Sequence, residues 1–192
     1  MNVIQIGANR GFDDVTELIK EKNISKLILV EPFEEHNESL KTCYESIGNF
    51  EIQNIIIQDD PNLTECQIFY HTHDASHRNA FELASLVKNH SLKIRGQYEE
   101  DGIIGRTLKC MTINQLFDSH RLVEIDLLFI DTEGYDCKIL KSLDFEKYKI
   151  KELYYENLHC DVSEIREFLK SKGYTVTPNV MSHGWSDKAE LN

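Results

Sequence analysis

Three carboxylates lie within six residues of one another, at Asp131, Glu133 and Asp136, directly after an apolar run that ends at Ile130. Like charges this close repel one another unless something compensates them. One candidate is Mg²⁺ or another hard cation bound through oxygen atoms, which could orient a substrate hydroxyl and lower its pKa. The alternative is structural, because the helix dipole favours acidic side chains in a first helical turn. We treat the three acids as candidate metal ligands.

His159 follows the next apolar segment and is a second candidate for chemistry. A neutral imidazole can act as a general base toward a hydroxyl group, and Glu156 could orient it or hold the substrate. A surface histidine is the alternative. Together with the acids above, the pattern predicts Asp131, Glu133 and His159 as catalytic residues.

A glycine turn follows the first apolar run, in the stretch Val3-Ile4-Gln5-Ile6-Gly7-Ala8-Asn9-Arg10-Gly11. Glycine permits backbone angles that other residues avoid, and it lets a ligand approach the backbone closely. Asp13 and Asp14 then begin a helical pattern. A strand, turn and helix of this kind typically hold part of a nucleotide-like cofactor.

Glu31 lies 24 positions after Gly7, at the end of the second apolar run. An acid there can accept two hydrogen bonds from a ribose diol, whereas the alternative is a solvated acid at a strand end. A dinucleotide site requires G-x-G-x-x-G, and Asn9 stands where the second glycine should be. A nicotinamide-dependent oxidoreductase therefore fits poorly. A ligand with one ribose and no phosphate fits better, and S-adenosylmethionine is such a ligand.

The candidate residues above follow apolar runs, so their positions depend on strands that alternate with helices along the chain. Apolar runs predict strands at 26–30, 50–57, 66–71, 107–111, 125–130, 151–156 and 174–177, and the tail could add another. Helical spacing predicts helices at 13–22, 33–47, 112–119, 135–142 and 163–172. The alternation indicates a largely parallel sheet with helices on both faces, which binds ligands at the carboxyl ends of its strands.

The periodicity fades between residues 71 and 106, a stretch rich in His, Asn, Ser and Glu. An irregular stretch this long inside a compact domain is often functional. Its His71-x-His73-x-x-x-His77 spacing could indicate a metal site, but the lack of a clear helix favours loop residues. Its lysines and arginines could attract an anionic acceptor, although a solvated loop fits equally well.

Chain length, net charge and composition limit the classes of protein to which this chain can belong. A chain of 192 residues suits a single domain, and its net charge of −12 argues against nucleic acid or an anionic membrane as the main partner. No apolar run approaches the roughly 20 residues of a membrane span, and no leader is evident. The five single cysteines predict free thiols in a reducing, cytoplasmic location. They are Cys43, Cys66, Cys110, Cys137 and Cys160.

Several motifs together resemble the FkbM-type methyltransferases along nearly the whole chain. They are Gly7-Ala8-Asn9-x-Gly11, Val30-Glu31-Pro32, Ala84-Ser85-Leu86, Tyr155-Glu156-Asn157-Leu158-His159 and, most specifically, the string Ile125-Asp126-Leu127-Leu128-Phe129-Ile130-Asp131-Thr132-Glu133-Gly134-Tyr135-Asp136. The resemblance implies a Rossmann-like class I methyltransferase fold, α/β, with a mostly parallel seven-stranded sheet. It implies one domain over 1–192, in which 71–106 is an insertion on the acceptor side.

The resemblance also implies S-adenosylmethionine as cofactor and methyl transfer to a hydroxyl of a sugar or another small metabolite, including an anionic glycan. An oligomer is compatible with it, whereas nucleic acid and membrane partners are not expected. The alternative is a non-catalytic module that keeps the fold, as a partner subunit of a larger enzyme. N-terminal elements that often cover the cofactor in the family are not part of this sequence, which favours that alternative slightly.

The motif match assigns cofactor contacts residue by residue. Gly7, Ala8 and Asn9 would line the methionine part, Glu31 would hold the ribose, and Ile56, Ile57 and Gln58 would border the adenine. Gln5 stands where most of the family has Asp, and its amide brings no charge to the cofactor's ammonium group. The full set of predicted cofactor residues is Gln5, Gly7, Ala8, Asn9, Gly11, Glu31, Pro32, Ile57, Gln58 and Asp131.

Overall fold

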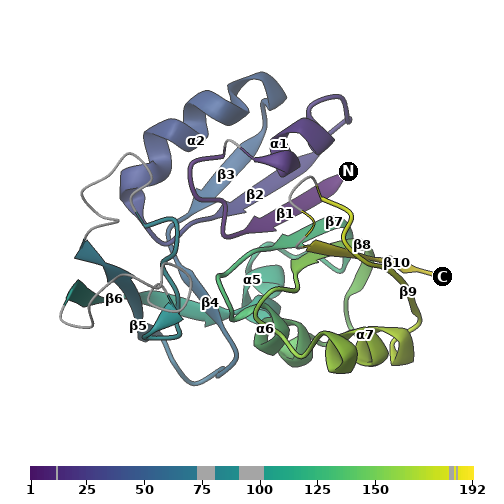
Figure 1. Cartoon of the computed structure of the whole chain (residues 1–192). Helices are drawn as coiled ribbons and strands as arrows, with labels where there is room; N and C mark the ends of the chain where they lie inside the picture. The colour runs from purple at the N-terminus through teal and green to yellow at the C-terminus, as the bar shows by residue number, and fades with distance from the viewer. Residues whose placement is uncertain (12, 73–80, 91–101, 182–183, 185) are drawn as a thin grey trace.

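The computed structural model describes residues 1–11, 13–72, 81–90, 102–181, 184 and 186–192. Its main sheet has seven strands in the order β3-β2-β1-β7-β8-β10-β9 (Figure 1). All neighbours pair in parallel except β10, which is antiparallel to β8 and β9. The strands are β1 (Asn2–Ile6), β2 (Lys26–Val30), β3 (Phe50–Gln53), β7 (Glu124–Ile130), β8 (Lys149–Glu156), β9 (Tyr174–Thr177) and β10 (Ser186–Leu191). The predicted mostly parallel α/β sheet is confirmed.

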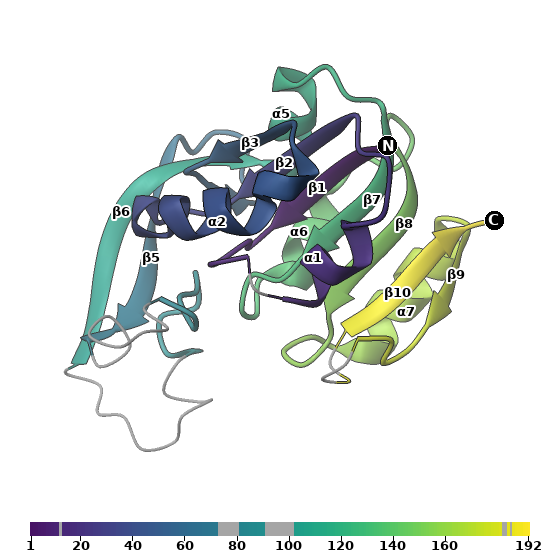
Figure 2. The ribbon, with the colours of Figure 1, turned by 90° about the horizontal axis from the view of Figure 1, so that it is seen from above.

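Helices cover both faces of this sheet (Figures 1 and 2). One face carries α1 (Asp14–Ile19) and α2 (Asn37–Tyr44), flanked by the short helices η1 (Glu34–His36) and η2 (Glu45–Ile47); the other carries α5 (Ile113–Ser119), α6 (Asp136–Ser142) and α7 (Val162–Ser171). Side chains alternate along each strand, so Val3 packs with the first group and Ile4 with the second. Among the described residues, no helix is both long and apolar enough to cross a bilayer.

A second sheet of three strands, in the order β4-β6-β5, stands beside the main one and extends away from it in Figure 2. Its strands are β4 (Ile56–Gln58), β5 (Glu65–His71) and β6 (Ile103–Thr112). The predicted strand 50–57 is therefore two strands in different sheets. A tight turn separates them, in which Ile55 N donates to Gln53 O at 3.0 Å, while the Asn54 side chain donates to Glu31 O at 2.9 Å. Both halves are apolar, so the pattern could not show the change of sheet.

The stretch 71–106 is only partly described, and residues 73–80 and 91–101 lie outside the described residues. Its last residues are regular rather than irregular, since β6 begins at Ile103 and pairs with β5. Segment 81–90 is joined to β5 through a bridge between Phe69 and Ser85. The His71-x-His73-x-x-x-His77 motif is only partly described. His71 lies in β5, whereas His73 and His77 lie outside the described residues.

Candidate active site

A cavity of about 480 Å³ opens at the carboxyl ends of β1, β2 and β7, within the size range of small-molecule sites. Its wall comes from the turn after β1, the end of β2, strands β4 and β5, segment 81–86 and the loop after β7. The predicted site residues on its wall are Gly7, Asn9, Gly11, Glu31, Pro32, Ile57, Asp131 and Glu133. The predicted residues that do not line it are Gln5, Ala8, Gln58, Asp136 and His159.

The glycine turn after β1 is held close to both neighbouring strands. Gly7 N and Ala8 N both donate to Val30 O at 3.0 Å. Gly7 has φ of 81°, and a Cβ atom there would lie 1.7 Å from the carbonyl oxygen of Asp131. Ala8 is fully buried, so it packs beneath the turn rather than facing the cavity. The turn therefore presents backbone, and the side chain of Asn9, to a ligand.

Glu31 is a buried carboxylate, 4% exposed, at the end of β2. Its Oε2 accepts from Asn9 N at 2.8 Å and its Oε1 accepts from Phe33 N at 3.0 Å, with His36 Nδ1 3.3 Å from Oε1. These contacts fix the carboxylate on the cavity wall. Each carboxylate oxygen can accept more than one hydrogen bond, so both can also receive the hydroxyls of a diol.

Apolar residues of the second sheet form the wall beyond Glu31. Ile55, Ile56, Ile57 and Ile68 line the cavity, together with a stacked pair of rings, Phe33 and Phe81, with centroids 4.1 Å apart. Gln58, predicted to border the adenine, follows Ile57 in β4, and its amide donates to Asp60 O at 2.7 Å in the turn that follows. Phe81 was not predicted, since it lies in a segment without periodicity.

Gln5 lies behind the cavity. Its Nε2 donates to Asp13 Oδ2 at 2.7 Å, and its Oε1 accepts from Tyr44 OH at 2.5 Å. Asp13 itself lines the cavity and also caps α1 by accepting from Val15 N and Thr16 N. The carboxylate that the sequence lacks at Gln5 is therefore present nearby, on Asp13. The sequence indicated Asp13 as a helix start and gave no sign of this second position.

Asp131 follows β7 and is anchored by its backbone, since Asp131 N donates to Ile6 O at 2.9 Å. Asp131 is exposed to solvent and lines the cavity. Partial desolvation at the cavity wall, followed by the charges of Glu133 and Asp13, raises the pKa of Asp131 to about 7. Asp131 can therefore both accept and hold a proton near neutral pH.

Asp136 does not join Asp131 and Glu133 around a common point. It is fully buried, and its two oxygens accept from Thr132 N at 3.0 Å and Gly134 N at 3.2 Å. Burial, and then the charge of Asp131, raises the pKa of Asp136 to about 8. Its role is to shape the loop, which bends sharply through positive φ values at Glu133 (54°) and Gly134 (93°). Nothing in the described residues supports the predicted Mg²⁺ site on these three acids.

Glu133 instead meets two histidines. His90 Nε2 lies 2.7 Å from Glu133 Oε2, and the rings of His90 and His159 meet edge to face with centroids 4.4 Å apart. Possible ligand atoms of these three residues lie within 4.8 Å of one another. His159 thus reaches the site through Glu133, although it does not line the cavity. His90 was not predicted, because it is a single histidine in the stretch without periodicity.

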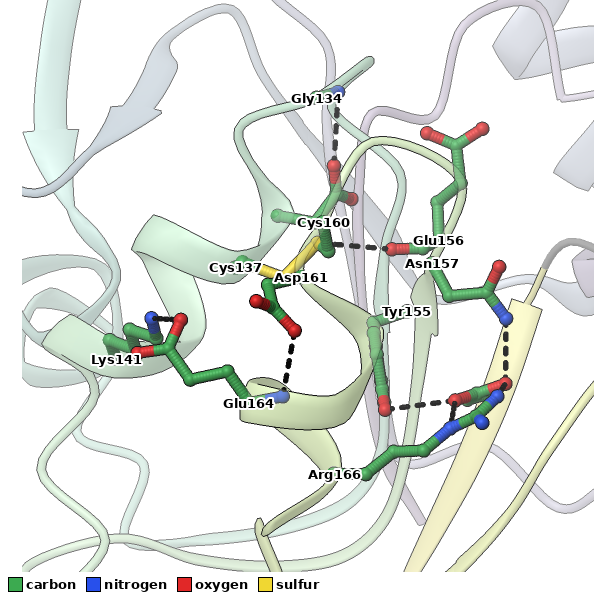
Figure 3. Close-up of a disulfide and its surroundings, with 12 residues drawn as sticks. Gly134, Cys137, Lys141, Tyr155, Glu156, Asn157, Cys160, Asp161, Glu164 and Arg166 are labelled. Atoms are coloured by element: carbon green, nitrogen blue, oxygen red, sulfur yellow. Dashed lines mark hydrogen bonds and ion pairs between the residues drawn. A yellow bond between two sulfur atoms is a disulfide. The ribbon is translucent and has the colours of Figure 1, made fainter. Parts of the chain in front are cut away.

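Glu156 ends β8 and is 8% exposed, and its Oε2 has no partner among the described residues. Figure 3 shows its side chain pointing away from the group around Tyr155 and Arg166. Burial, followed by the charges of Asp131, Glu133 and Asp136, raises the pKa of Glu156 to about 9. The raised pKa favours the protonated form of Glu156 near neutral pH.

Cys137, in the first turn of α6, and Cys160, after β8, form a disulfide with Cα atoms 6.0 Å apart (Figure 3). The prediction of five free thiols was wrong for this pair; Cys43, Cys66 and Cys110 are free. The two cysteines are 23 positions apart in sequence. They meet because β7 and β8 are adjacent parallel strands, which places the segments that follow them side by side.

Comparison with known proteins identifies a family for this chain. No curated protein matches the chain. A provisionally assigned O-methyltransferase from Klebsiella pneumoniae is 12% identical over 100% of this chain and 73% of its own, with a TM-score of 0.49. An O-methyltransferase from Bacillus cereus, solved in complex with S-adenosylhomocysteine, is 12% identical over 98% of this chain and 73% of its own, also with a TM-score of 0.49. Likenesses this distant identify neither a reaction nor a substrate.

The family match is broader. The model of the methyltransferase FkbM domain matches residues 5–176, which is 172 of the 192 residues. The matched range contains the glycine turn, Glu31, the loop after β7 and the end of β8. The chain belongs to the FkbM family of methyltransferase domains, as its motifs predicted.

Proposed function

We propose that this protein is an S-adenosylmethionine-dependent O-methyltransferase that acts on a hydroxyl of a sugar or another small metabolite. The observation that carries the proposal is the cavity in which the glycine turn after β1 faces the buried carboxylate of Glu31. Membership of a methyltransferase family supports the reaction type.

The cavity wall fits a nucleoside joined to an amino acid. Gly7 leaves room for a ligand against the backbone, and the fixed carboxylate of Glu31 suits a ribose diol. The apolar residues Ile56 and Ile57 suit the faces of an adenine. Asn9 Oδ1 is buried with no partner among the described residues, so it can accept from a polar ligand. Asp13 offers a negative charge for the amino group of the methionine part.

When bound, the cofactor supplies a methyl group on a positively charged sulfur. The chain then contributes orientation of the acceptor and removal of its hydroxyl proton. Asp131 is the candidate base, because it lies on the cavity wall and its pKa of about 7 lets it hold the proton at neutral pH. Glu133 lies on the same wall, with His90 and His159 behind it.

The acidic edge of the cavity favours an uncharged acceptor. Asp131, Glu133 and Glu82 line it, and Arg10 is the cation among the described lining residues, so acidic side chains outnumber basic ones. A hydroxyl-rich neutral molecule such as a sugar can donate hydrogen bonds to these carboxylates, while an anionic acceptor would be repelled.

Calorimetry with S-adenosylhomocysteine tests the cofactor half of the proposal. The wild-type chain should bind it, Glu31→Gln should abolish binding, and Glu34→Gln should leave binding unchanged. Glu34 is an exposed acid three residues away, so this control makes the same change of charge without touching the cavity. A folded wild-type chain that binds neither this compound nor S-adenosylmethionine would refute the proposal.

Turnover tests the catalytic half. Asp131→Asn should still bind S-adenosylhomocysteine but lose at least about 100-fold in methyl transfer to a panel of neutral sugars, as is typical for removal of a general base. Cofactor binding by the wild-type chain without transfer to any hydroxylated acceptor would favour a non-catalytic module instead.

A further inference from the structure

Two histidines and a carboxylate meet beside the cavity, from three segments that are far apart in sequence. His90 ends segment 81–90, Glu133 lies between β7 and α6, and His159 lies between β8 and α7. His90 is buried, with 3% exposure, and its Nε2 is 2.7 Å from Glu133 Oε2. The candidate ligand atoms of all three lie within 4.8 Å of one another.

The fold holds each of the three segments in place. Ser85 Oγ donates to the backbone oxygen of Glu133 at 2.6 Å, and Ser85 exchanges backbone hydrogen bonds of 2.8 and 2.9 Å with Phe69 of β5. The carboxylate of Asp136 fixes the loop that carries Glu133. Cys160, next to His159, is bonded to Cys137 at the start of α6. Such support keeps ligands near a working geometry before any ion arrives.

Gly134 lets the histidines come this close to the loop. Its φ is 93°, and a Cβ atom there would lie 3.2 Å from His90 Nδ1 and 3.3 Å from His159 Cβ. A larger residue would push both rings outward. The close approach is therefore built into the backbone as well as into the side chains.

We propose that His90, Glu133 and His159 together bind one divalent transition-metal ion. Two imidazoles and one carboxylate suit Zn²⁺, Mn²⁺, Fe²⁺ or Co²⁺, whereas Mg²⁺ prefers oxygen ligands alone. The carboxylate of Glu133, 2.7 Å from His90 Nε2, brings a negative charge to the three ligands, which favours a cation. The site differs from the predicted one, because it keeps Glu133 and replaces both aspartates with histidines.

Three protein ligands leave at least one coordination position open for another molecule. Glu133 lines the cavity, so that position can be offered to the acceptor; this role rests on the proposed function, whereas metal binding does not. Such an ion would make a bound hydroxyl lose its proton more easily, and Asp131, on the same cavity wall, would accept that proton. Methyl transfer would then form the oxygen–methyl bond as the methyl–sulfur bond of the cofactor breaks, leaving a neutral thioether.

Titration of the metal-free 192-residue chain with Co²⁺ tests the proposal, because ligation by histidine changes the visible absorption of the ion. One ion should bind per chain, and Zn²⁺ should displace it. His90→Ala, Glu133→Gln and His159→Ala should each weaken binding at least about tenfold, the lower end of the loss typical even for residues behind a ligand. His120→Ala is the matched control, because it removes another histidine near a glutamate, Glu51 at 3.7 Å, and should bind like wild type.

A measurement on the wild-type chain keeps the proposal testable if some of the variants do not fold. In imidazole NMR spectra, Zn²⁺ should shift the signals of two of the eight histidines, and the folded His159→Ala chain identifies one of them. No Co²⁺ or Zn²⁺ binding, or binding that persists in all three variants, overturns the proposal. So does binding that is lost in His71→Ala but retained in the three variants, because it would move the site to the other histidines.

The metal proposal and the cofactor proposal can each be refuted without refuting the other. The Co²⁺ titration contains no cofactor, and the calorimetry with S-adenosylhomocysteine is run in the presence of a chelator. A chain that binds the cofactor but no metal refutes only the metal site. A chain that binds Co²⁺ through these residues but no cofactor supports the metal site and refutes the proposed function.

Discussion

At Gly7 the backbone of β1 passes so close to β7 that a side chain has no room. Gly48 offers a matched comparison, because its φ of 86° is close to the 81° of Gly7 and no described atom lies within 4 Å of its Cβ position. Alanine in such a strained backbone conformation costs roughly 1 to 3 kcal/mol at either site. Only Gly7→Ala must also separate Cβ from the carbonyl oxygen of Asp131, now 1.7 Å away.

We therefore expect Gly48→Ala to lower the free energy of unfolding by roughly 1 to 3 kcal/mol and to leave S-adenosylhomocysteine binding intact. Gly7→Ala should cost about 2 kcal/mol more, as overpacking of a tight contact typically does, and should abolish binding. Urea unfolding and calorimetry measure both quantities. Equal losses of stability in the two variants would show that the close approach at Gly7 is unimportant.

Glu156 should make stability depend on pH. Its pKa rises from an ordinary value of 4.5 to about 9 on folding, because it is buried beside Asp131, Glu133 and Asp136. The folded state therefore holds a proton that the unfolded state releases, so this residue's contribution to stability falls as pH rises from about 4.5 through about 9. The raised pKa values of Asp131 and Asp136 change stability in the same direction as pH rises. Only a substitution at Glu156 therefore separates its contribution from theirs.

Glu156→Gln should remove that part of the slope. Relative to wild type, its urea midpoint should be clearly higher at pH 8 and nearly equal at pH 5, where both side chains are neutral when folded. A difference that is the same at both pH values would mean that Glu156 is ionised in the folded state throughout.

Residues with a strong local signal could be predicted, and residues without one could not. Gly7 and Glu31 stand at the ends of clear apolar runs, and both lie on the cavity wall. His90 and Ser85 lie in a stretch without periodicity, so only the fold brings them to Glu133. Asp13 was recognised as a helix start, but its place on the wall depends on the path of the turn.

Among the elements, the segment after β8 is held on two sides. The disulfide joins it to α6, and the buried Asp187 of β10 accepts from Arg166 Nε and Asn157 Nδ2, both at 2.7 Å, and from Tyr155 OH at 3.1 Å (Figure 3). Burial opposes ionisation of Asp187, but these donors outweigh it and lower the pKa. The short segment that carries His159 is thereby tied at both ends.

Removing the disulfide should destabilise the fold measurably. A bond that closes a loop of 23 positions limits the unfolded chain enough to contribute about 3 kcal/mol. We expect Cys137→Ser to lower the free energy of unfolding by about this amount in the absence of reductant. Adding reductant should destabilise wild type and leave the variant unchanged.

Thiol titration of the unfolded wild-type chain, without reductant, provides the control for that experiment. Three of the five cysteines should react, namely Cys43, Cys66 and Cys110. Five reactive thiols, as composition alone predicts, would contradict the bond. The outcome also bears on His159, since a free Cys160 would leave its segment held by the Asp187 contacts alone.

Strands surrounded by other strands were predicted well, whereas a change of sheet was not. Lys26–Val30 is buried on both faces and reads as a continuous apolar run, which is typical of a parallel sheet. Phe50–Gln53 and Ile56–Gln58 are separated only by Asn54 and Ile55, yet they pair with different partners. An apolar run indicates that a segment is buried, but it does not indicate which strand that segment pairs with.

At the scale of the whole molecule, the cavity is lined by residues of both sheets. Gly7, Glu31 and Asp131 belong to the carboxyl edge of the main sheet, whereas Ile57 and Ile68 belong to the second sheet. A ligand that fills the cavity contacts both, and binding to the folded state alone adds to its stability. Cofactor binding should therefore be visible in the unfolding of the entire chain.

At a concentration of S-adenosylhomocysteine 100 times its Kd, the free energy of unfolding should rise by about 2.7 kcal/mol. For a domain of this size that corresponds to an increase in Tm of roughly 5 to 10 °C. Glu31→Gln should unfold at a temperature that the compound does not change, because the ribose contact is lost, while NAD should shift neither protein. An equal increase in Tm for wild type and Glu31→Gln would mean that the compound binds elsewhere, and the role assigned to the carboxylate at the end of β2 would be wrong.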